Sequence, residues 1–360
     1  MNKKICFFSG DISRSGGTER VATVIANELN NRGWEVCFLS LGNGKSSFFP
    51  LNKSIPLYSL EMENKSMKIN YIKTVRKLHR FLKSNQIDFL VDIDTILTLF
   101  SVPATILLNT KVISWDHFSF DAKIGNFAQD TIRFFSRLIS INFSFRTICL
   151  TKSDEKHYKS LLSLKKNVIQ IYNPVTLNLK EESKRNKKRV LAVGHLNKIK
   201  GHDRLIKAWK LVKSKGYKDW NLDIIGGGDE LENLLKLSKN LKIENSINFF
   251  GKQKNISDYY KNSSIFVLTS FSEGFPLVVL EARNFGLPVI SFDCGSGIKE
   301  IIINKKDGII VKQNDIKELA IQIIKLIENK TYRDFLGKNA FADKRFELKN
   351  IILQWEKIFE

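Results

Sequence analysis

Cysteine and proline are both scarce in this sequence. Its 360 residues include 4 cysteines and 6 prolines, and 43% of them are hydrophobic and 26% charged. This composition excludes disordered, collagen-like and low-complexity chains. No two cysteines have metal-site spacing or form a C-x-x-C motif, so we expect buried thiols in a reducing compartment: Cys6, Cys37, Cys149 and Cys294.

Long apolar runs are also absent. Residues 96–108 form the longest nearly apolar run, which is shorter than the roughly 18 residues that span a membrane. Only the short apolar run at residues 5–8 follows the lysines at the N-terminus, too short for the apolar region of a signal peptide. We therefore expect a cytoplasmic protein that contacts a membrane only peripherally, at its inner face.

Acidic residues are outnumbered by basic ones. The chain has 58 Lys and Arg against 37 Asp and Glu, a formal net charge of +21. Both halves share the excess, because residues 1–180 carry 25 basic and 14 acidic side chains and residues 181–360 carry 33 and 23. Such a charge suits nucleic acid, anionic lipid or a phosphorylated substrate, or else only keeps the surface solvated. No nucleic-acid-binding module is recognisable, so we expect no nucleic-acid partner.

The length and the apolar pattern predict two α/β domains. Single cores rarely exceed about 250–300 residues. In both halves short apolar runs alternate with amphipathic helical stretches, which is typical of doubly wound parallel sheets. Because ligands bind at the carboxyl ends of parallel strands, we expect the active cleft between the domains. We predict Rossmann-like domains at 1–174 and 190–338, a linker at 175–189, and C-terminal helices at 339–360 that return to the first domain.

Three glycine turns each follow a predicted strand and precede a predicted helix. Glycines let the backbone approach a ligand closely, and a helix start offers N–H groups to an anion. A lysine at such a turn can neutralise a diphosphate, although each turn alone could also be a plain tight turn. The three segments are Ser15-Gly16-Gly17-Thr18-Glu19-Arg20, Val193–Gly201 with His195 and Lys200, and Ile225-Gly226-Gly227-Gly228-Asp229-Glu230.

Two carboxylates bracket a fourth turn and the start of another predicted helix. The segment is Glu273-Gly274-Phe275-Pro276-Leu277-Val278-Val279-Leu280-Glu281. At this spacing both carboxylates can face one cleft. One carboxylate can accept hydrogen bonds from two ribose hydroxyls, and the other can hold a sugar hydroxyl or stabilise developing positive charge.

The fourth segment resembles the E-x7-E signature of family 4 retaining glycosyltransferases, which have the GT-B fold of two Rossmann-like domains facing a cleft. The resemblance covers essentially the whole chain. Four further segments are similar to family motifs in the same order: Ser15–Arg20 to G-G-x-E-R, Val193–Gly201 to V-G-R-L-x-x-x-K-G, Ile225–Glu230 to G-x-G-x-E/D, and residues 297–308 to G-x-x-E-I-I…D-G.

The resemblance implies roles for the matched residues. Glu273 would hold the transferred sugar, Glu281 the donor ribose and Lys200 the diphosphate, while His117 resembles the first-domain histidine near the reacting sugar. The implied catalytic residues are Glu273, His117 and Lys200. The implied donor ligands are Gly17, His195, Lys200, Gly226, Glu273, Phe275, Leu277, Val278 and Glu281, and the implied acceptor ligands are Gly16, Thr18 and His117.

Two positions depart from the family pattern. His195 stands where the family usually has arginine, so a fixed cation is replaced by a group that can be neutral. Pro276 stands where many members have glycine, which removes a backbone donor to the phosphates. Both departures favour a variant site over an inactive protein, because Lys200 and both glutamates are present.

The implied activity is retaining transfer of a hexose or N-acetylhexosamine from a nucleoside diphosphate sugar, expected to be UDP-linked. The expected acceptor is a polyprenyl-diphosphate-linked saccharide in capsule, exopolysaccharide or O-antigen synthesis. A nucleotide-sugar epimerase or hydrolase of the same fold and a sugar-nucleotide-binding protein without activity are the alternatives. The segment Asp92-Ile93-Asp94 resembles the D-x-D metal motif of the other glycosyltransferase fold, but that fold leaves the E-x7-E segment unexplained. We therefore expect no metal and no other cofactor.

Two basic stretches are candidates for contact with anionic lipid. Between residues 65 and 86 there is no acidic residue, and apolar residues recur at helical spacing. Between residues 118 and 146 seven phenylalanines are interleaved with Lys123, Arg133, Arg137 and Arg146, which suits either a lipid boundary or a protein core. The first stretch carries Lys65, Lys68, Lys73, Arg76, Lys77, Arg80 and Lys83, of which we assign Lys73, Arg76, Lys77 and Arg80 to the membrane.

Overall fold

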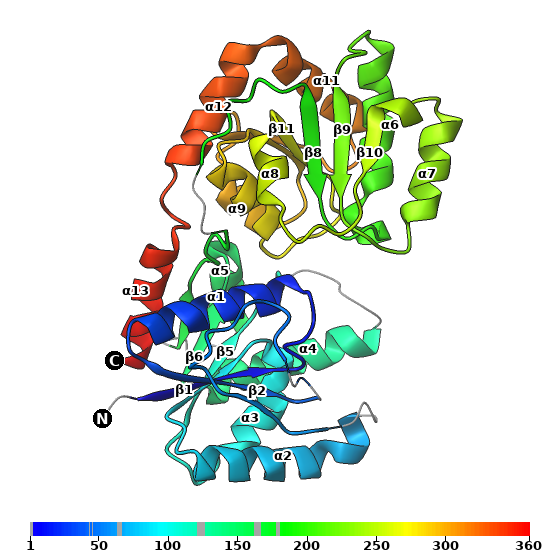
Figure 1. The fold of residues 1–360 in the computed structure, drawn as a ribbon. Coiled ribbons are helices and arrows are strands. Elements are labelled where there is room, and N and C mark those ends of the chain that lie inside the picture. Colours follow the sequence, from blue (N-terminus) through cyan, green and yellow to red (C-terminus); the bar gives the residue numbers. More distant parts are fainter. Residues whose placement is uncertain are drawn as a thin grey trace. The chain divides into compact units, whose positions relative to one another are not determined.

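The computed structural model describes residues 3–42, 44, 46–62, 67–120, 127–161, 167–177 and 181–360. The chain divides into two compact units, the first made of residues 1–176 and 347–360 and the second of residues 177–346 (Figure 1). Each unit is built around one parallel sheet, so the prediction of two parallel α/β sheets is confirmed.

The first unit has a seven-stranded sheet in the order β3-β2-β1-β4-β5-β6-β7, and all neighbouring strands are parallel. In chain order its elements are β1 (Lys4–Ser9), α1 (Gly17–Asn31), β2 (Glu35–Ser40), β3 (Leu57–Ser59), α2 (Met67–Ser84), β4 (Phe89–Asp92), η1 (Thr95–Leu97), α3 (Thr98–Ala104), β5 (Lys111–Trp115), α4 (Phe127–Phe143), β6 (Arg146–Cys149), α5 (Lys152–Leu161), β7 (Val168–Gln170) and α13 (Leu348–Phe359).

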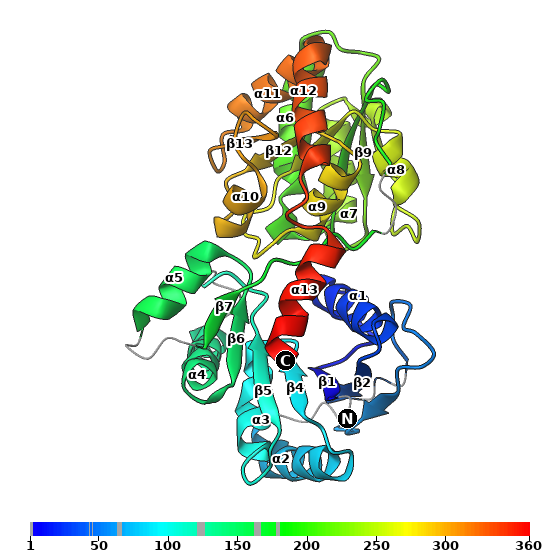
Figure 2. The same cartoon turned by 90° about the vertical axis from the view of Figure 1, so that its left-hand side faces the viewer.

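Strands of the first sheet are apolar on both faces because helices cover both faces. Cys6 and Phe8 of β1 belong to a buried cluster with side chains of α2 and α3. The intervening Phe7 points to the other face, where its ring centroid lies 6.3 Å from that of Trp355 in α13. Helices α1 and α13 contact each other on this second face (Figure 2). The last helix of the chain is therefore part of the core of the first unit.

The second unit has a six-stranded sheet in the order β10-β9-β8-β11-β12-β13, again with parallel neighbours. In chain order its elements are β8 (Arg189–Val193), η2 (Lys198–Lys200), α6 (His202–Ser214), β9 (Asn221–Ile225), α7 (Leu231–Asn240), η3 (Glu244–Ser246), β10 (Ile247–Phe249), α8 (Ser257–Lys261), β11 (Ile265–Leu268), α9 (Leu277–Asn284), β12 (Val289–Phe292), α10 (Ser296–Ile301), β13 (Gly308–Val311), α11 (Ile316–Glu328) and α12 (Lys330–Ala342).

The strand order of the second sheet reverses at β8, which lies between β9 and β11. At such a switch point the loops that follow the two neighbouring strands diverge to opposite faces and leave space for a ligand. The loop after β8 contains Lys200, and the loop after β11 contains Glu273. The topology alone therefore brings two of the predicted site residues to one place.

The segment between the sheets differs from the predicted linker at 175–189. Ser183 is buried and donates a hydrogen bond to Ser263 O at 2.8 Å. Arg185 is also buried and donates to Gly286 O at 2.9 Å and to the Asp334 carboxylate at 3.1 Å. Because these groups find their partners inside the second unit, residues 177–189 belong to it.

Helix α12 belongs to the second unit as well, and within the predicted segment 339–360 only residues 347–360 are part of the first unit.

Replacing Trp355 with alanine should destabilise the first unit, because the indole is fully buried against Phe7 and against Trp115, whose ring centroid is 4.7 Å away. We expect a loss of about 3–5 kcal/mol in the free energy of unfolding, measured by urea denaturation. Leu353 lies on the same helix but is 50% exposed, so Leu353→Ala should cost less than about 0.5 kcal/mol. Equal losses in the two variants would contradict the assignment of α13 to this core.

Candidate functional site

The centre of the site in the second unit is an ion pair between two predicted residues. Lys200 Nζ lies 2.6 Å from Glu273 Oε1. The same oxygen accepts a hydrogen bond from Ser270 Oγ at 2.6 Å. The carboxylate is 12% exposed and the lysine 26%, so both are shielded but still accessible. The turn after β8 and the turn after β11 thus bring a cation and a carboxylate together.

The backbone on either side of Lys200 is tied to the loop that precedes Glu273. Phe271 N donates to Ile199 O at 2.8 Å, and Thr269 Oγ1 donates to Lys200 O at 3.1 Å. Asn197 caps the short helix η2, because its side-chain oxygen accepts a hydrogen bond from Lys200 N at 3.1 Å. These bonds fix the position of the lysine while its long side chain remains able to turn.

Two residues that were not predicted from the sequence hold the loop that precedes Glu273. Arg204, at the start of α6, donates to Thr269 O and to Gln313 Oε1, the latter at 2.6 Å, and its guanidinium lies 3.5 Å from the centroid of the Phe271 ring. Gln313 in turn donates to Ser270 O at 3.2 Å. An arginine four residues after Lys200 is the only sequence signal of this support, and it does not reveal the partner at 313.

Glycines at the carboxyl edge of the second sheet are required by close backbone approach. Gly226 has φ +147°, and a Cβ atom there would lie 1.8 Å from Gly194 O. A Cβ atom at Gly297 would lie 1.9 Å from Gly274 O. The glycine turns predicted from sequence therefore pack against one another, which leaves backbone rather than side chains at the surface of the site.

Glu281 is placed differently from Glu273. It is fully buried in α9, and its Oε2 accepts a hydrogen bond from Tyr260 OH of α8 at 3.0 Å. Tyr260 was not found from sequence, because it comes from another helix and belongs to no motif. The two carboxylates of the E-x7-E segment thus have distinct environments. Glu273 forms an ion pair, whereas Glu281 is buried in the protein interior.

The turn between these carboxylates leads directly into α9. Pro276 is the N-cap of α9 and offers no side-chain cap. The first helical hydrogen bond runs from Val279 N to Pro276 O at 3.0 Å. The N–H groups of Leu277 and Val278 precede it, as expected at a helix start, and Phe275 is buried just before it. The predicted donor ligands Phe275, Leu277 and Val278 are therefore arranged around one helix N-terminus.

Two buried titratable groups near the ion pair, His202 and Cys294, are neutral at pH 7. Burial, and next the charge of Lys200, lowers the pKa of His202 to about 4. Burial, and next the charge of Glu273, raises the pKa of the Cys294 thiol to about 12. The predicted His195 is exposed in the turn before Lys200. Lys200 and Glu273 thus supply the charge at this switch point, and Cys294 is no nucleophile.

In the first unit the predicted residues Gly16, Gly17 and Thr18 form the start of α1. Gly16 is the N-cap of this helix and has no side chain to cap it. Thr18 Oγ1 donates to Glu19 Oε2 at 2.8 Å. The loop that follows β2 joins this turn, because Phe48 N donates to Ile12 O at 3.2 Å.

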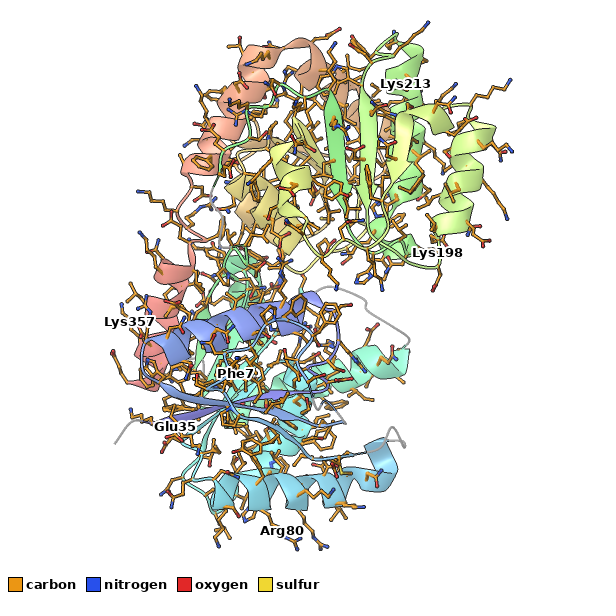
Figure 3. The ribbon with its side chains drawn as sticks, viewed as in Figure 1. Phe7, Glu35, Arg80, Lys198, Lys213 and Lys357 are labelled. Carbon is orange, nitrogen blue, oxygen red and sulfur yellow. The ribbon has the colours of Figure 1, made fainter. Side chains whose placement is uncertain are left out.

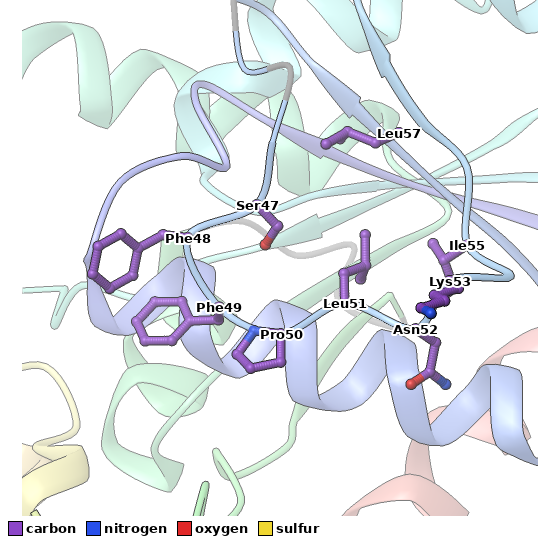
Figure 4. A pocket seen from close by; sticks show the side chains of 9 residues that line it. All are labelled: Ser47, Phe48, Phe49, Pro50, Leu51, Asn52, Lys53, Ile55 and Leu57. Atoms are coloured by element: carbon purple, nitrogen blue, oxygen red, sulfur yellow. The ribbon is translucent and has the colours of Figure 1, made fainter. Parts of the chain in front are cut away.

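A shallow hollow is lined by residues 47–57 of the same loop (Figure 4). Phe48 and Phe49 meet there edge to face with ring centroids 5.1 Å apart, and Phe48 is 59% exposed. No carboxylate or imidazole lines the hollow. It offers apolar surface beside the glycine turn but no group for acid–base chemistry.

His117 follows β5 and is buried at 7% exposure. Its ring centroid is 4.2 Å from that of Trp115, and among the residues that the structure describes its Nε2 has no hydrogen-bond partner. Burial lowers the pKa of His117 to about 3, so the imidazole is neutral at pH 7. A buried nitrogen without a partner is costly and is an expected feature of a site that awaits a ligand.

The carboxylates of the rival D-x-D segment contact protein groups, although Asp92 Oδ2 has no hydrogen-bond partner among the described residues. Asp92 is buried, accepts a hydrogen bond from Ser101 Oγ at 2.5 Å, and has its pKa raised by burial. Asp94 binds both terminal nitrogens of Arg133, at 2.9 and 3.1 Å. In the part of the chain that the structure describes, no group of three or more His, Cys, Asp or Glu side chains is arranged to hold a metal.

The basic stretches are only partly as predicted. On α2, Lys73, Arg76 and Arg80 are exposed, and Figure 3 shows Arg80 projecting away from the sheet. Lys77 is instead half-buried and donates to Leu60 O at 2.7 Å, so it is not free for lipid. Lys65 and Lys123, together with the side chain of Lys68, lie outside the described residues.

In the second basic stretch the arginines and the phenylalanines of α4 lie in different environments. Arg133 and Arg137 of α4 are buried because they pair with the carboxylates of Asp94 and Asp116. The phenylalanines of this helix are exposed, at 88% for Phe127, 56% for Phe135 and 69% for Phe143. Helix α4 therefore has its charges inside and apolar groups outside. Within the described ranges, no helix is both long and apolar enough to cross a membrane.

Two protein families together match nearly the whole chain. The family described as Glycosyltransferase Family 4 matches residues 15–179, and the family described as Glycosyl transferases group 1 matches residues 176–343.

Similar proteins cover the chain from end to end. An uncharacterized glycosyltransferase of Haemophilus influenzae is 37% identical, and the amylovoran biosynthesis glycosyltransferase AmsD of Erwinia amylovora is 30% identical, each over 99% of both chains. A GalNAc-α-(1→4)-GalNAc-α-(1→3)-diNAcBac-PP-undecaprenol α-1,4-N-acetyl-D-galactosaminyltransferase of Campylobacter jejuni is 26% identical over 99% of this chain and 98% of its own. The solved structure of Anabaena HepE in complex with UDP has the same fold, with a TM-score of 0.82, 19% identity and 99% of both chains covered.

Replacing Gly226 with alanine should disrupt the glycine turns, because the new Cβ atom would overlap Gly194 O and φ is +147°. We expect a loss of about 1–3 kcal/mol or more in the stability of the second unit, measured by thermal unfolding. The matched control is Gly227→Ala, whose Cβ atom would meet only the flexible side chain of Lys252. A control as unstable as Gly226→Ala would contradict the role given to backbone approach.

Proposed function

The chain belongs to glycosyltransferase family 4 and has the GT-B fold, and from this premise we propose the reaction that it performs. It transfers a hexose or N-acetylhexosamine from a UDP-linked sugar to a polyprenyl-diphosphate-linked saccharide, with retention of the anomeric configuration. The product contributes to a bacterial surface polysaccharide such as capsule, exopolysaccharide or O-antigen. The observation that carries this proposal is the Lys200–Glu273 ion pair at the switch point of the second sheet.

In this proposal Lys200 binds the diphosphate of the donor. Its ammonium is the partly exposed cation at the edge of the sheet, and the N–H groups of Leu277 and Val278 at the start of α9 offer further donors. During transfer the bond between the anomeric carbon and the diphosphate oxygen breaks, and negative charge grows on the leaving group. A lysine and a helix start fixed in advance stabilise that charge without reorganisation.

Glu273 holds the transferred sugar in this proposal. When Lys200 binds the diphosphate in place of Glu273, the carboxylate oxygens of Glu273 can accept hydrogen bonds from sugar hydroxyls. Glu281 holds the ribose, and Tyr260 orients its carboxylate. The acceptor hydroxyl then attacks the anomeric carbon on the face that the leaving diphosphate occupies, and its proton passes to that diphosphate, so UDP leaves and the configuration is retained.

The names of similar proteins support this choice of substrates. AmsD of Erwinia amylovora is named for biosynthesis of amylovoran, and the Campylobacter jejuni enzyme is named for transfer to an undecaprenol-diphosphate-linked saccharide. HepE was solved with UDP. We propose that transfer needs no metal, because Asp92 and Asp94 are engaged by protein groups.

A donor panel tests the function directly. Each donor is mixed with a lipid-linked saccharide, with and without EDTA, and the mass of the products is measured by mass spectrometry. The donors are UDP-glucose, UDP-galactose, UDP-GlcNAc, UDP-GalNAc and GDP-mannose. We expect one donor to add one sugar mass to the acceptor in both conditions. Free sugar or an isomerised donor formed without acceptor would instead support a hydrolase or an epimerase.

We propose further that the first unit docks on the inner face of the cytoplasmic membrane. Helix α3 contacts both α2 and α4, so the three helices cover one face of the first sheet. The exposed cations of α2 suit anionic headgroups, and the exposed phenylalanines of α4 suit the acyl boundary. A protein that modifies a lipid-linked acceptor gains from such a surface, because the acceptor is confined to the membrane.

Lys200→Ala and Glu273→Ala should each lower kcat by at least about 100-fold with the fold intact, since each removes a group that acts on the transferring sugar or the leaving diphosphate. Turnover with the active donor and thermal unfolding measure the two effects. Lys198→Ala is the matched control, because Lys198 is an exposed lysine of the same short helix. Near-normal turnover in either site variant would refute the assignment.

Replacing Lys73, Arg76 and Arg80 with glutamine should weaken binding to anionic vesicles in low salt. Each basic residue near such a surface contributes about 1 kcal/mol, so affinity should fall roughly 100-fold in a sedimentation assay. The control changes the exposed Lys236, Lys239 and Lys254 of the second unit to glutamine, which removes the same charge. If the two triple variants bind vesicles equally, the α2 surface is not the docking site.

A further inference from the structure

The loop after β5, residues Asp116 to Phe120, is unusually well held for a loop. Asp116 is 1% exposed, and its Oδ2 accepts a hydrogen bond from Tyr158 OH at 2.6 Å, while its Oδ1 accepts one from Phe118 N at 3.1 Å. Phe120 N donates to Asp154 Oδ1 at 2.8 Å. Both ends of the loop are therefore fixed by buried carboxylates.

Arg137 of α4 joins these contacts into one unit. Its Nε donates to Asp116 Oδ2 at 2.8 Å. Its terminal nitrogens donate to the carbonyl oxygens of Phe118 and Ser119 at 3.1 Å and of Phe120 at 2.8 Å. The residue is 4% exposed, so a single buried guanidinium binds four acceptors of the loop.

Stability alone is a weak reason for such an arrangement. Buried ion pairs often contribute little net stability compared with apolar groups of the same shape, but they define one conformation strictly. The residue inside this well-satisfied loop, His117, has a buried Nε2 without a partner. Among the described residues, three carbonyl oxygens of the loop are bound by Arg137, whereas one imidazole nitrogen has no hydrogen-bond partner.

We infer that Arg137 is a positioning residue, which clamps the loop 116–120 so that His117 keeps its unpaired nitrogen in place for a hydroxyl group of the substrate. Burial lowers the pKa of His117 most strongly, the charge of Asp116 raises it less, and the charge of Arg133 lowers it further. The inference rests on the proposed function, because it assigns the hydroxyl to the sugar or acceptor of that reaction.

Arg137→Lys tests the clamp. Lysine keeps the charge but lacks the planar fork that reaches four acceptors, so the loop should loosen. We expect kcat to fall roughly 10- to 100-fold, the loss that follows a misplaced reacting group, while the donor KM changes less than about twofold. The KM should hold because the residues that we assign to the nucleotide lie in the second unit.

A second readout follows the imidazole itself. NMR titration of ¹⁵N-labelled histidine, with the His117 signal assigned from His117→Gln, should show its pKa rising in Arg137→Lys toward the usual value of about 6.5, because water reaches the loosened loop. Arg146→Lys is the control and should change neither readout, since Arg146 lies on β6 outside the clamp.

Several outcomes would overturn the inference. These are normal kcat in Arg137→Lys, a fall in kcat with an unchanged His117 titration, or a rise in donor KM alone. If Arg137→Lys does not fold, Asp116→Asn removes the ion pair with nearly the same shape, and the same split between kcat and KM is required of it. If the wild-type protein transfers no sugar, the proposed function fails, and an unchanged His117 titration in Arg137→Lys still overturns the clamp.

Discussion

The arrangement of the second unit depends on how closely the backbone turns approach one another at the carboxyl edge of its sheet. The turn after β9 touches the turn after β8, and the start of α10 touches the turn after β11, at distances that exclude a Cβ atom. Glycine at these positions is therefore a steric requirement. Because these positions carry no side chains, the edge of the sheet presents backbone groups together with a few long side chains such as Lys200.

The Lys200–Glu273 ion pair follows from this constraint. Hydrogen bonds between residues 199–200 and residues 269–271 join the two turns, and the two side chains then meet at 2.6 Å. A partly exposed pair of this kind has a modest energy. The pair can therefore separate when a more highly charged partner such as a diphosphate arrives, which a deeply buried pair could not do. The Asp116–Arg137 pair of the first unit is of the buried type and is suited to holding a loop still.

The sequence predicts the position of a residue well where that residue belongs to one turn between a strand and a helix. Lys200, Glu273 and the glycines belong to short segments that link a strand to a helix, so their proximity follows from the parallel sheet. The prediction failed where partners come from distant helices. Examples are Tyr260, which donates a hydrogen bond to Glu281, and Arg137, which binds the loop that contains His117. Helix α4 also has an inverted pattern, with arginines inside and phenylalanines outside, so its side-chain pattern misleads about which residues are free. Whether the net charge of +21 brings the protein to a membrane cannot be read from composition, because buried arginines contribute to it as much as exposed ones.

We propose that Lys200 binds the donor diphosphate and that Glu273 holds this lysine until the donor binds. Calorimetric titration of UDP, which lacks the sugar, into the wild-type protein, Lys200→Met and Glu273→Gln measures this most directly. We predict that Lys200→Met weakens UDP binding at least about 10-fold, because a charge-assisted contact is lost. Glu273→Gln should strengthen UDP binding, because the lysine is released and a like charge is removed. Unchanged UDP affinity in Lys200→Met, or weaker affinity in Glu273→Gln, would contradict the account.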